Sequence, residues 1–431
     1  MKRLITLLIT LLCITYLSAT ELQTQALYSN DHHLLAYQDP SQIHRSYPQK
    51  DTLQPLMGYI TIEERYNFGI SVLLQKIYAL DVDSVTLTID LSLQQRVEEI
   101  LDEYKAFLKA DEILVAVMES GTGKVRAMAS SNRYDPNEVT KVDFLKMHQK
   151  FSIYAYEPGA VIMPLILSAA LERRFIERNS LITTHNGRMA LDNGSFITDA
   201  TPTTMLTPEG ILLNMSNIGI AKVAYLFSGY EFEESLRAFG FGDYTKIELH
   251  YGRNGNFPTL QKLTERIYRA NTSYGYGMSA TFVQLIQAYS AFNNDGQRVT
   301  PTLIDSLYAK DDNLSSFSWT IAAPVEVISK ETAQVIHKML ISNVHKGFAK
   351  QASLQGLETG GMGSTAYIAK GGRYVREYHS SFYGFANDVV GNRYTIGVLV
   401  IRPKDPHNFY ASRSAVPVFR EVVEVLFSKK R

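Results

Sequence analysis

The sequence predicts an α/β (α+β) fold in which helices flank an antiparallel sheet. Alternating β-branched, apolar and polar residues predict strands near both ends of the chain. Apolar residues at helical spacing dominate the long middle region. Strands at both ends around a helical middle favour a sheet whose first and last strands are neighbours. The length of 431 residues fits one large domain with a small appendage.

The first clear elements are expected from residue 84 onward. Residues 85–90 predict a strand, and Ser92 is expected to cap a helix that reaches Leu108. Upstream, residues 56–60 also have strand character. The rest of residues 21–80 is polar and weakly patterned. This part of the sequence therefore predicts few regular elements.

The remaining elements are predicted from the same strand and helix periodicities. Apolar runs at 113–118 and 125–129 flank a glycine-rich turn and predict a hairpin. Pro158 fits the first position of a helix that continues through Leu171. Further helices are expected at 218–227, 231–239, 280–292 and 416–427, and strands at 380–386 and 394–401.

Composition excludes several classes of function. Lys+Arg and Asp+Glu both number 43, so the basic excess of a nucleic-acid-binding surface is absent. The single cysteine, Cys13, leaves the rest of the chain without disulfide or thiol chemistry. His32 and His33 are adjacent, but no cysteine or ordered carboxylate cluster accompanies them, which favours a solvated loop. We therefore expect no metal and no cofactor.

The first residues have the pattern of an export signal. A basic start precedes an apolar run over 4–17, which ends in Ser18-Ala19-Thr20. This predicts a signal peptide over 1–20. The run is shorter than the roughly 20 apolar residues of a membrane span, so an uncleaved anchor over 4–19 is the second alternative. Both alternatives place the remainder outside the cytoplasmic membrane, in the periplasm.

Several segments, in chain order, resemble the transpeptidase domain of class B penicillin-binding proteins. The likeness extends from residue 84 to residue 431. It implies the penicillin-binding protein or serine β-lactamase-like transpeptidase fold for that region. Residues 21–83 would be a shortened form of the family's pedestal domain. The segments that carry the likeness are 86–90, 121–130, 135–137, 156–164, 274–296 and 381–386.

That family has three catalytic motifs, Ser-x-x-Lys, Ser-x-Asn and Lys-Thr-Gly. Its serine attacks an acyl carbon, and a lysine one helical turn later accepts the serine proton. In the first motif of this chain, Ala160 stands at the serine position and Met163 at the lysine position. The flanking residues 156–159 match the family closely. The resemblance therefore locates the site but not the reacting groups.

The other two motifs are altered in the same way. Met215 replaces the second serine, whereas Asn217 is kept. In the third motif, Met362, Gly363 and Ser364 replace lysine, threonine and glycine, and Thr365 matches the residue that often follows. Methionine fills apolar space adaptably, and no lysine is left as an unpaired buried charge. The replacements predict a polar cleft converted into an apolar one.

The resemblance and its altered motifs together imply a catalytically inactive homologue. We expect a scaffold or regulator of peptidoglycan synthesis. Its partners would be cell-wall synthesis or division proteins, for example a membrane glycan polymerase or an active penicillin-binding protein. Loss of the nucleophile alone costs on the order of a million-fold in another serine hydrolase.

Two alternatives stay open. One is a transpeptidase that uses displaced residues. The other is a module that binds stem peptides without cleaving them, through Asn217 and Thr365. Against the first, no substitute nucleophile has a base three residues along a helix. The nearest substitutes in the sequence are Ser152, Ser216, Ser364 and Lys222.

Overall fold

The computed structural model describes residues 25–38, 45–58, 69–78, 82–140, 143, 146–191, 194–309, 317–319 and 321–428. The expected signal or anchor in residues 1–20 lies outside these ranges. Within them, no helix has both the length and the apolar character needed to cross a bilayer.

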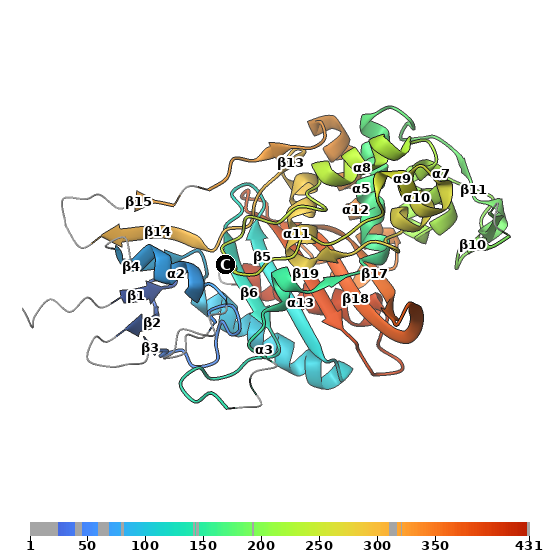
Figure 1. Cartoon of the computed structure of the whole chain (residues 1–431). Coiled ribbons are helices and arrows are strands. Elements are labelled where there is room, and N and C mark those ends of the chain that lie inside the picture. Colours follow the sequence, from blue (N-terminus) through green and yellow to red (C-terminus); the bar gives the residue numbers. More distant parts are fainter. Residues whose placement is uncertain are drawn as a thin grey trace, which may run out of the picture.

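A five-stranded antiparallel sheet forms the centre of the larger part of the molecule (Figure 1). Its strand order is β17-β18-β19-β5-β6, so the early strand β5 pairs with the last strand β19. This confirms the predicted hairpin, the two C-terminal strands and the neighbouring first and last strands. The bounds are β5 Glu112–Glu119, β6 Val125–Ser130, β17 Glu358–Lys370, β18 Arg373–Asn387 and β19 Arg393–Ile401.

Helices cover both faces of this sheet. Successive side chains of a strand point to opposite faces, and in this sheet the side chains on both faces are apolar. Val115 and Val117 pack with α3 (Leu91–Leu108) and α13 (Ala415–Ser428) in one buried cluster. Leu114 and Ala116 belong to the other cluster, which contains α11 (Phe282–Ser290).

The helix α3 begins two residues earlier than predicted. The expected cap was Ser92, but the N-cap is Asp90, whose carboxylate accepts the N–H of Leu93 at 2.8 Å. A carboxylate at this position both satisfies a free N–H and interacts well with the positive end of the helix.

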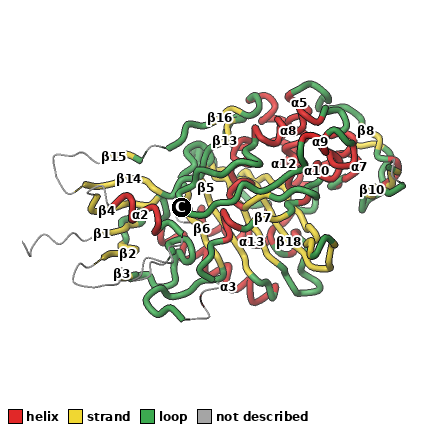
Figure 2. Tube along the Cα trace, in the orientation of Figure 1, coloured by secondary structure: helices red, strands yellow, loops and turns green. Residues whose placement is uncertain are grey.

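A helical lobe packs beyond β17 (Figure 2). Pro158 was expected at the first helical position, but it precedes a short 3-10 turn, η2 (Gly159–Ile162), and α5 begins at Met163. The lobe and its neighbours contain α4 Lys150–Ile153, α5 Met163–Glu172, α6 Pro208–Asn214, α7 Asn217–Ala224, α8 Gly229–Ala238, α9 Leu260–Leu263, α10 Arg266–Ser273 and α12 Lys330–Lys346.

The helix predicted over 280–292 is shorter at its start. Ala280 and Thr281 form the strand β12, which pairs with β7 (Ala155–Tyr156), and α11 starts after a capping box made by Thr281 and Gln284. The strand pairing overrides the local helical pattern. Three other two-stranded pairs are β8 (Ile182–Thr183) with β11 (Met205–Leu206), β9 (Arg188–Ala190) with β10 (Phe196–Thr198), and β13 (Gln297–Arg298) with β16 (Val325–Glu326).

A second sheet of six strands lies at the end of the molecule near β4 and β14 (Figure 1). The predicted boundary between residues 83 and 84 falls within β4, and the sheet takes strands from both sides of it. The strand expected at 56–60 is wrong where it is described, because residues 56–58 belong to no strand. The order is β15 Phe317–Ser318, β14 Ile304–Ala309, β4 Val82–Leu87, β1 Gln25–Tyr28, β2 Leu34–Gln38 and β3 Arg45–Ser46, and α2 Ser71–Tyr78 packs beside β4.

The two histidines expected in a loop lie in the exposed turn between β1 and β2. His33 Nε2 is 3.6 Å from the carboxylate of Asp31. Across the described ranges, no group of three His, Cys, Asp or Glu side chains is arranged to hold a metal ion.

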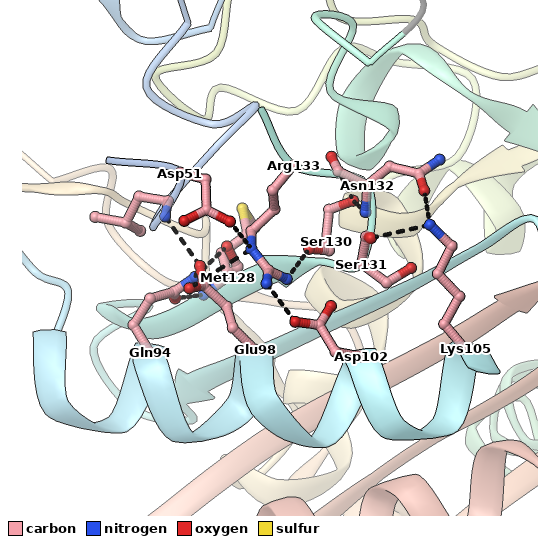
Figure 3. A network of polar contacts seen from close by, with 11 residues as sticks. Asp51, Gln94, Glu98, Asp102, Lys105, Met128, Ser130, Ser131, Asn132 and Arg133 are labelled. Atoms are coloured by element: carbon pink, nitrogen blue, oxygen red, sulfur yellow. Dashed lines mark hydrogen bonds and ion pairs between the residues drawn. The ribbon is translucent and has the colours of Figure 1, made fainter. Parts of the chain in front are cut away.

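A network of polar contacts connects residues 51–53 to α3 and to Arg133, which follows β6 of the central sheet (Figure 3). The N–H of Leu53 donates to Glu98 Oε1 of α3 at 2.9 Å. Arg133, which follows β6, lies 2.6 Å from Asp102, 3.2 Å from Asp51 and 3.8 Å from Glu98. Burial raises the pKa of Glu98 to about 7 despite the nearby guanidinium.

Candidate functional site

The first motif begins in a tight backbone turn at Gly159. Gly159 has a φ of +63°, and a Cβ there would lie 2.2 Å from Ser364 Oγ. Gly275 faces it with a φ of +81°, and a Cβ there would lie 2.2 Å from the Gly159 oxygen. The Gly159 N–H donates to Gly275 O at 3.2 Å. Only glycine fits either position, since the turn is pressed against both β17 and the 274–277 turn.

Ala160 and Ser364 are direct neighbours. The backbone N–H of Ala160 donates to Ser364 Oγ at 3.0 Å, and Ser364 is only 4 % exposed. The structure therefore brings the first and third motif positions together, as the motif assignment requires. Backbone N–H groups beside a nucleophile are the donors that stabilise the oxyanion in acyl transfer. Here the donor at position 160 already has an intramolecular acceptor.

The two lysine positions are sealed in apolar surroundings. Met163, at the start of α5, and Met362, on β17, are both fully buried and belong to one hydrophobic cluster. Asn343 of α12 donates from Nδ2 to Gly361 O at 2.8 Å, and this nitrogen lies 3.6 Å from Met362 Sδ. A charged ammonium in place of either methionine would lose its hydration.

The second motif lies at the junction of α6 and α7. Met215 ends α6 in the left-handed conformation, with a φ of +48°, and its side chain packs against the cluster that contains Met163. Ser216 caps α7: its Oγ accepts the Gly219 N–H at 2.9 Å and donates to Asp199 Oδ2 at 2.5 Å. The intervening serine thus has a structural role.

The two residues predicted to bind a peptide both have partners within the chain. Asn217 Nδ2 donates to Thr198 O at 3.1 Å, which joins α7 to β10. Thr365 Oγ1 accepts the N–H of Ala411 at 2.9 Å. Peptide binding by these side chains stays a prediction.

Gly363 leaves a gap that a neighbouring ring fills. A Cβ at this position would lie 3.0 Å from two ring carbons of Phe348 and 3.2 Å from Ser381 O. The threonine of the family motif would therefore displace Phe348. The space beside the third motif is therefore occupied by Phe348 in this chain.

In the described part of the chain, the substitute nucleophiles have no lysine or histidine as a hydrogen-bonded base. Ser152 is buried in α4, and its Oγ accepts from Gln149 Nε2 at 2.6 Å. Among the hydrogen bonds of the described residues, none joins Ser152, Ser216 or Ser364 to a lysine or a histidine. Ser216 Oγ donates to the Asp199 carboxylate and accepts the Gly219 N–H, and the same carboxylate accepts the N–H of Ile218 at 3.0 Å.

A pocket of about 310 Å³ beside the first motif was not anticipated from the sequence. Glu157 lines it and accepts from the Gly277 N–H at 2.8 Å and from Tyr374 Oη at 3.2 Å. Burial raises the pKa of Glu157 above its usual value. His379, also in the lining, has its pKa lowered by burial to about 4, so it is neutral at pH 7. In the sequence, the only indication of this pocket is the Tyr156-Glu157 pair directly before the first motif.

Comparison with known proteins assigns this chain to a family. The model of the penicillin binding protein transpeptidase domain matches residues 113–424. The chain belongs to this family. Among its curated relatives, the peptidoglycan D,D-transpeptidase FtsI of Escherichia coli is 27% identical over 345 residues, covering 79% of this chain and 55% of the relative. The probable peptidoglycan D,D-transpeptidase PbpC of Pseudomonas aeruginosa is 31% identical over 308 residues, covering 70% and 51%.

Solved penicillin-binding proteins share the fold. Penicillin binding protein 3 of Mycobacterium tuberculosis aligns with a TM-score of 0.84 at 24% identity, covering 95% of this chain and 96% of that chain. The transpeptidase domain of Burkholderia pseudomallei penicillin-binding protein 3 aligns with a TM-score of 0.68 at 26% identity, covering 80% and 96%. The expected penicillin-binding protein fold is confirmed. The chain spans about half the length of the curated relatives that it matches.

Proposed function

We propose that this penicillin-binding protein homologue is catalytically inactive and acts as a scaffold or regulator of peptidoglycan synthesis. The main support for the proposal is that residue 160 is an alanine. Its side chain is a methyl group, and its N–H donates to Ser364 Oγ at 3.0 Å. Covalent acyl transfer needs a nucleophilic oxygen, a base and a donor for the oxyanion. The nucleophile is absent at position 160, and its donor is occupied.

The buried methionines support the same proposal. Met163 and Met362 stand at the two lysine positions and have no exposed surface. No ammonium group is present there to accept a serine proton or to pair with a substrate carboxylate. Removal of the nucleophile from another serine hydrolase lowers turnover on the order of a million-fold, and here the bases are replaced as well.

The scaffold role follows from what the chain keeps. The five-stranded sheet and the helices on both of its faces are intact, so surfaces outside the cleft remain available to partners. The names of the relatives support peptidoglycan synthesis as the process. The proposed location is the periplasm, after export by the segment in residues 1–20. The proposed partners are division or cell-wall synthesis proteins, such as a membrane glycan polymerase or an active penicillin-binding protein.

Cross-linking followed by affinity purification of the full chain from detergent-solubilised envelope tests this role. We expect capture of a cell-wall synthesis protein. The same capture is expected with Ser152→Ala and Ser216→Ala, since the scaffold needs no displaced nucleophile. Cleavage or cross-linking of muropeptides by the full chain, abolished by either substitution, would instead establish the displaced-residue transpeptidase.

A further inference from the structure

A second pocket, of about 900 Å³, lies beside α7 in the helical lobe. We name it the α7 pocket. It lies between the β9–β10 hairpin, α7 and the start of α10. Its principal lining residues are His185, Arg188, Lys222, Tyr225, Arg266 and Tyr268.

Positive charge dominates this pocket. Arg188, Lys222 and Arg266 contribute three cations, whereas Glu265 is the one carboxylate in the lining. In the described part of the chain, no ion pair engages any of these three cations. The chain as a whole has a net charge of zero, so the excess here is local. A concave surface lined by one sign of charge attracts ligands of the opposite sign.

Aromatic rings hold the two guanidinium groups without neutralising them. The Arg188 guanidinium lies 4.0 Å from the centre of the Phe196 ring, and that of Arg266 lies 5.5 Å from the Tyr225 ring. Such cation–π contacts limit the movement of the side chain. Among the hydrogen bonds of the described residues, none uses the N–H donors of these two guanidinium groups. Arginine binds a carboxylate in a bidentate manner through such donors.

The pocket is fixed to the second motif position. Lys222 lies on α7, and Tyr225, three residues later, is the C-cap of this helix and keeps a helical conformation, so both lie on one face of it. Asn217 Nδ2 bonds to Thr198 O, and Ser216 Oγ bonds to Asp199 Oδ2 at 2.5 Å. These contacts anchor the end of β10, so the hairpin wall is held against α7.

We propose that the α7 pocket binds the free carboxylates of an acidic peptidoglycan stem peptide. Such a peptide carries carboxylates beside short aliphatic side chains. The cations would bind the carboxylates, while Tyr225 and Tyr268 would pack against the aliphatic parts. The identity of the ligand rests on the proposed function, whereas the charge and shape of the pocket do not.

Titration calorimetry with the full chain and a disaccharide–tetrapeptide muropeptide tests the proposal. We expect saturable binding that is weakened about tenfold or more by Lys222→Gln with Arg266→Gln, because two charge-assisted hydrogen bonds are lost. Lys222→Arg, which keeps the positive charge, should retain most of the affinity. A matched control, Lys338→Gln with Lys350→Gln, removes two exposed cations outside the pocket and should change the affinity less than about twofold.

Three results would overturn the proposal. The first is no binding of the muropeptide, and the second is unchanged affinity in the pocket variant. The third is equal binding of a muropeptide whose carboxylates are amidated. Binding of phosphatidylglycerol vesicles but not muropeptide, with the same loss in the variant, would assign the pocket to lipid headgroups and also reject it. The proposed function is tested by a different measurement: acylation of the chain by penicillin would contradict it. Failure of the pocket proposal can therefore be distinguished from failure of the proposed function.

Discussion

The backbone N–H of Ala160 donates a hydrogen bond to the hydroxyl of Ser364, with 3.0 Å between nitrogen and oxygen. This bond joins the first motif position to the third. It also places a side-chain oxygen against the amide of the residue where a nucleophile would stand. The changes in the two motifs are therefore structurally linked, and restoring one of them does not restore the cleft.

Restoring the first motif alone should fail. We expect Ala160→Ser with Met163→Lys to fold, to remain unlabelled by a fluorescent penicillin, and to lose at least about 2 kcal/mol of stability. Met163 is fully buried, so the new ammonium would lose its hydration, and burial disfavours the charged form. Gel labelling and thermal unfolding measure both effects. Efficient labelling of this double variant would show that the cleft is still organised for catalysis.

The turn at Gly159 should tolerate no side chain. Gly159→Ala combines a φ of +63° with a Cβ 2.2 Å from Ser364 Oγ, so we expect a loss of at least about 2 kcal/mol. Gly356→Ala is the matched control, because its φ is +80° but nothing lies within 4 Å of the new Cβ. That variant should lose only about 1 kcal/mol. Equal losses in chemical denaturation would contradict the close approach of the turn to β17.

Phe348 should block repair of the third motif. Gly363→Thr would press its side chain into the Phe348 ring, 3.0 Å from the expected Cβ, and we expect a loss of about 1–3 kcal/mol. Phe348→Leu should relieve part of that loss. A double-mutant cycle measures the coupling between the two positions. Additive effects would mean that Phe348 does not occupy the space of the missing threonine side chain.

Stability should fall as pH rises because of Glu98. The folded-state pKa of Glu98 is raised from 4.5 to about 7. Its contribution is therefore fully present below pH 4.5 and is lost as pH rises through about 7, a change of at most about 3 kcal/mol. Glu98→Gln should flatten this dependence. Glu99→Gln, which changes the exposed neighbour on α3, should not, and unfolding between pH 5 and 8 compares the two.

Local patterns were sufficient to predict four strands of the central sheet, but not β17. Strands β5, β6, β18 and β19 have apolar residues that reach two buried faces, and this pattern is visible in the sequence. In the N-terminal sheet, the predicted strand 85–90 overlaps β4. The rest of this sheet was missed because its strands are short and β4 joins β1 to β14, which is more than 200 residues away. Long-range pairing of this kind leaves no local signal.

The site, too, has some features that the sequence predicts and others that depend on long-range packing. The family motifs located Ala160, Met163 and Met362, and the structure brings these positions to one cluster. The bond from Ala160 to Ser364 depends on tertiary packing and could not be predicted from spacing. The cations of the α7 pocket, Arg188, Lys222 and Arg266, lie in separate elements, so no sequence window contains them together.

Intact-mass measurement after incubation with benzylpenicillin tests the central claim most directly. Penicillin binding protein 3 of Mycobacterium tuberculosis, which has been solved in complex with ampicillin, is a suitable positive control. Under conditions that acylate the control to completion, we predict that the mass of this chain does not change, because position 160 has no hydroxyl group. A stoichiometric penicilloyl adduct mapped to any serine of this chain would contradict the account.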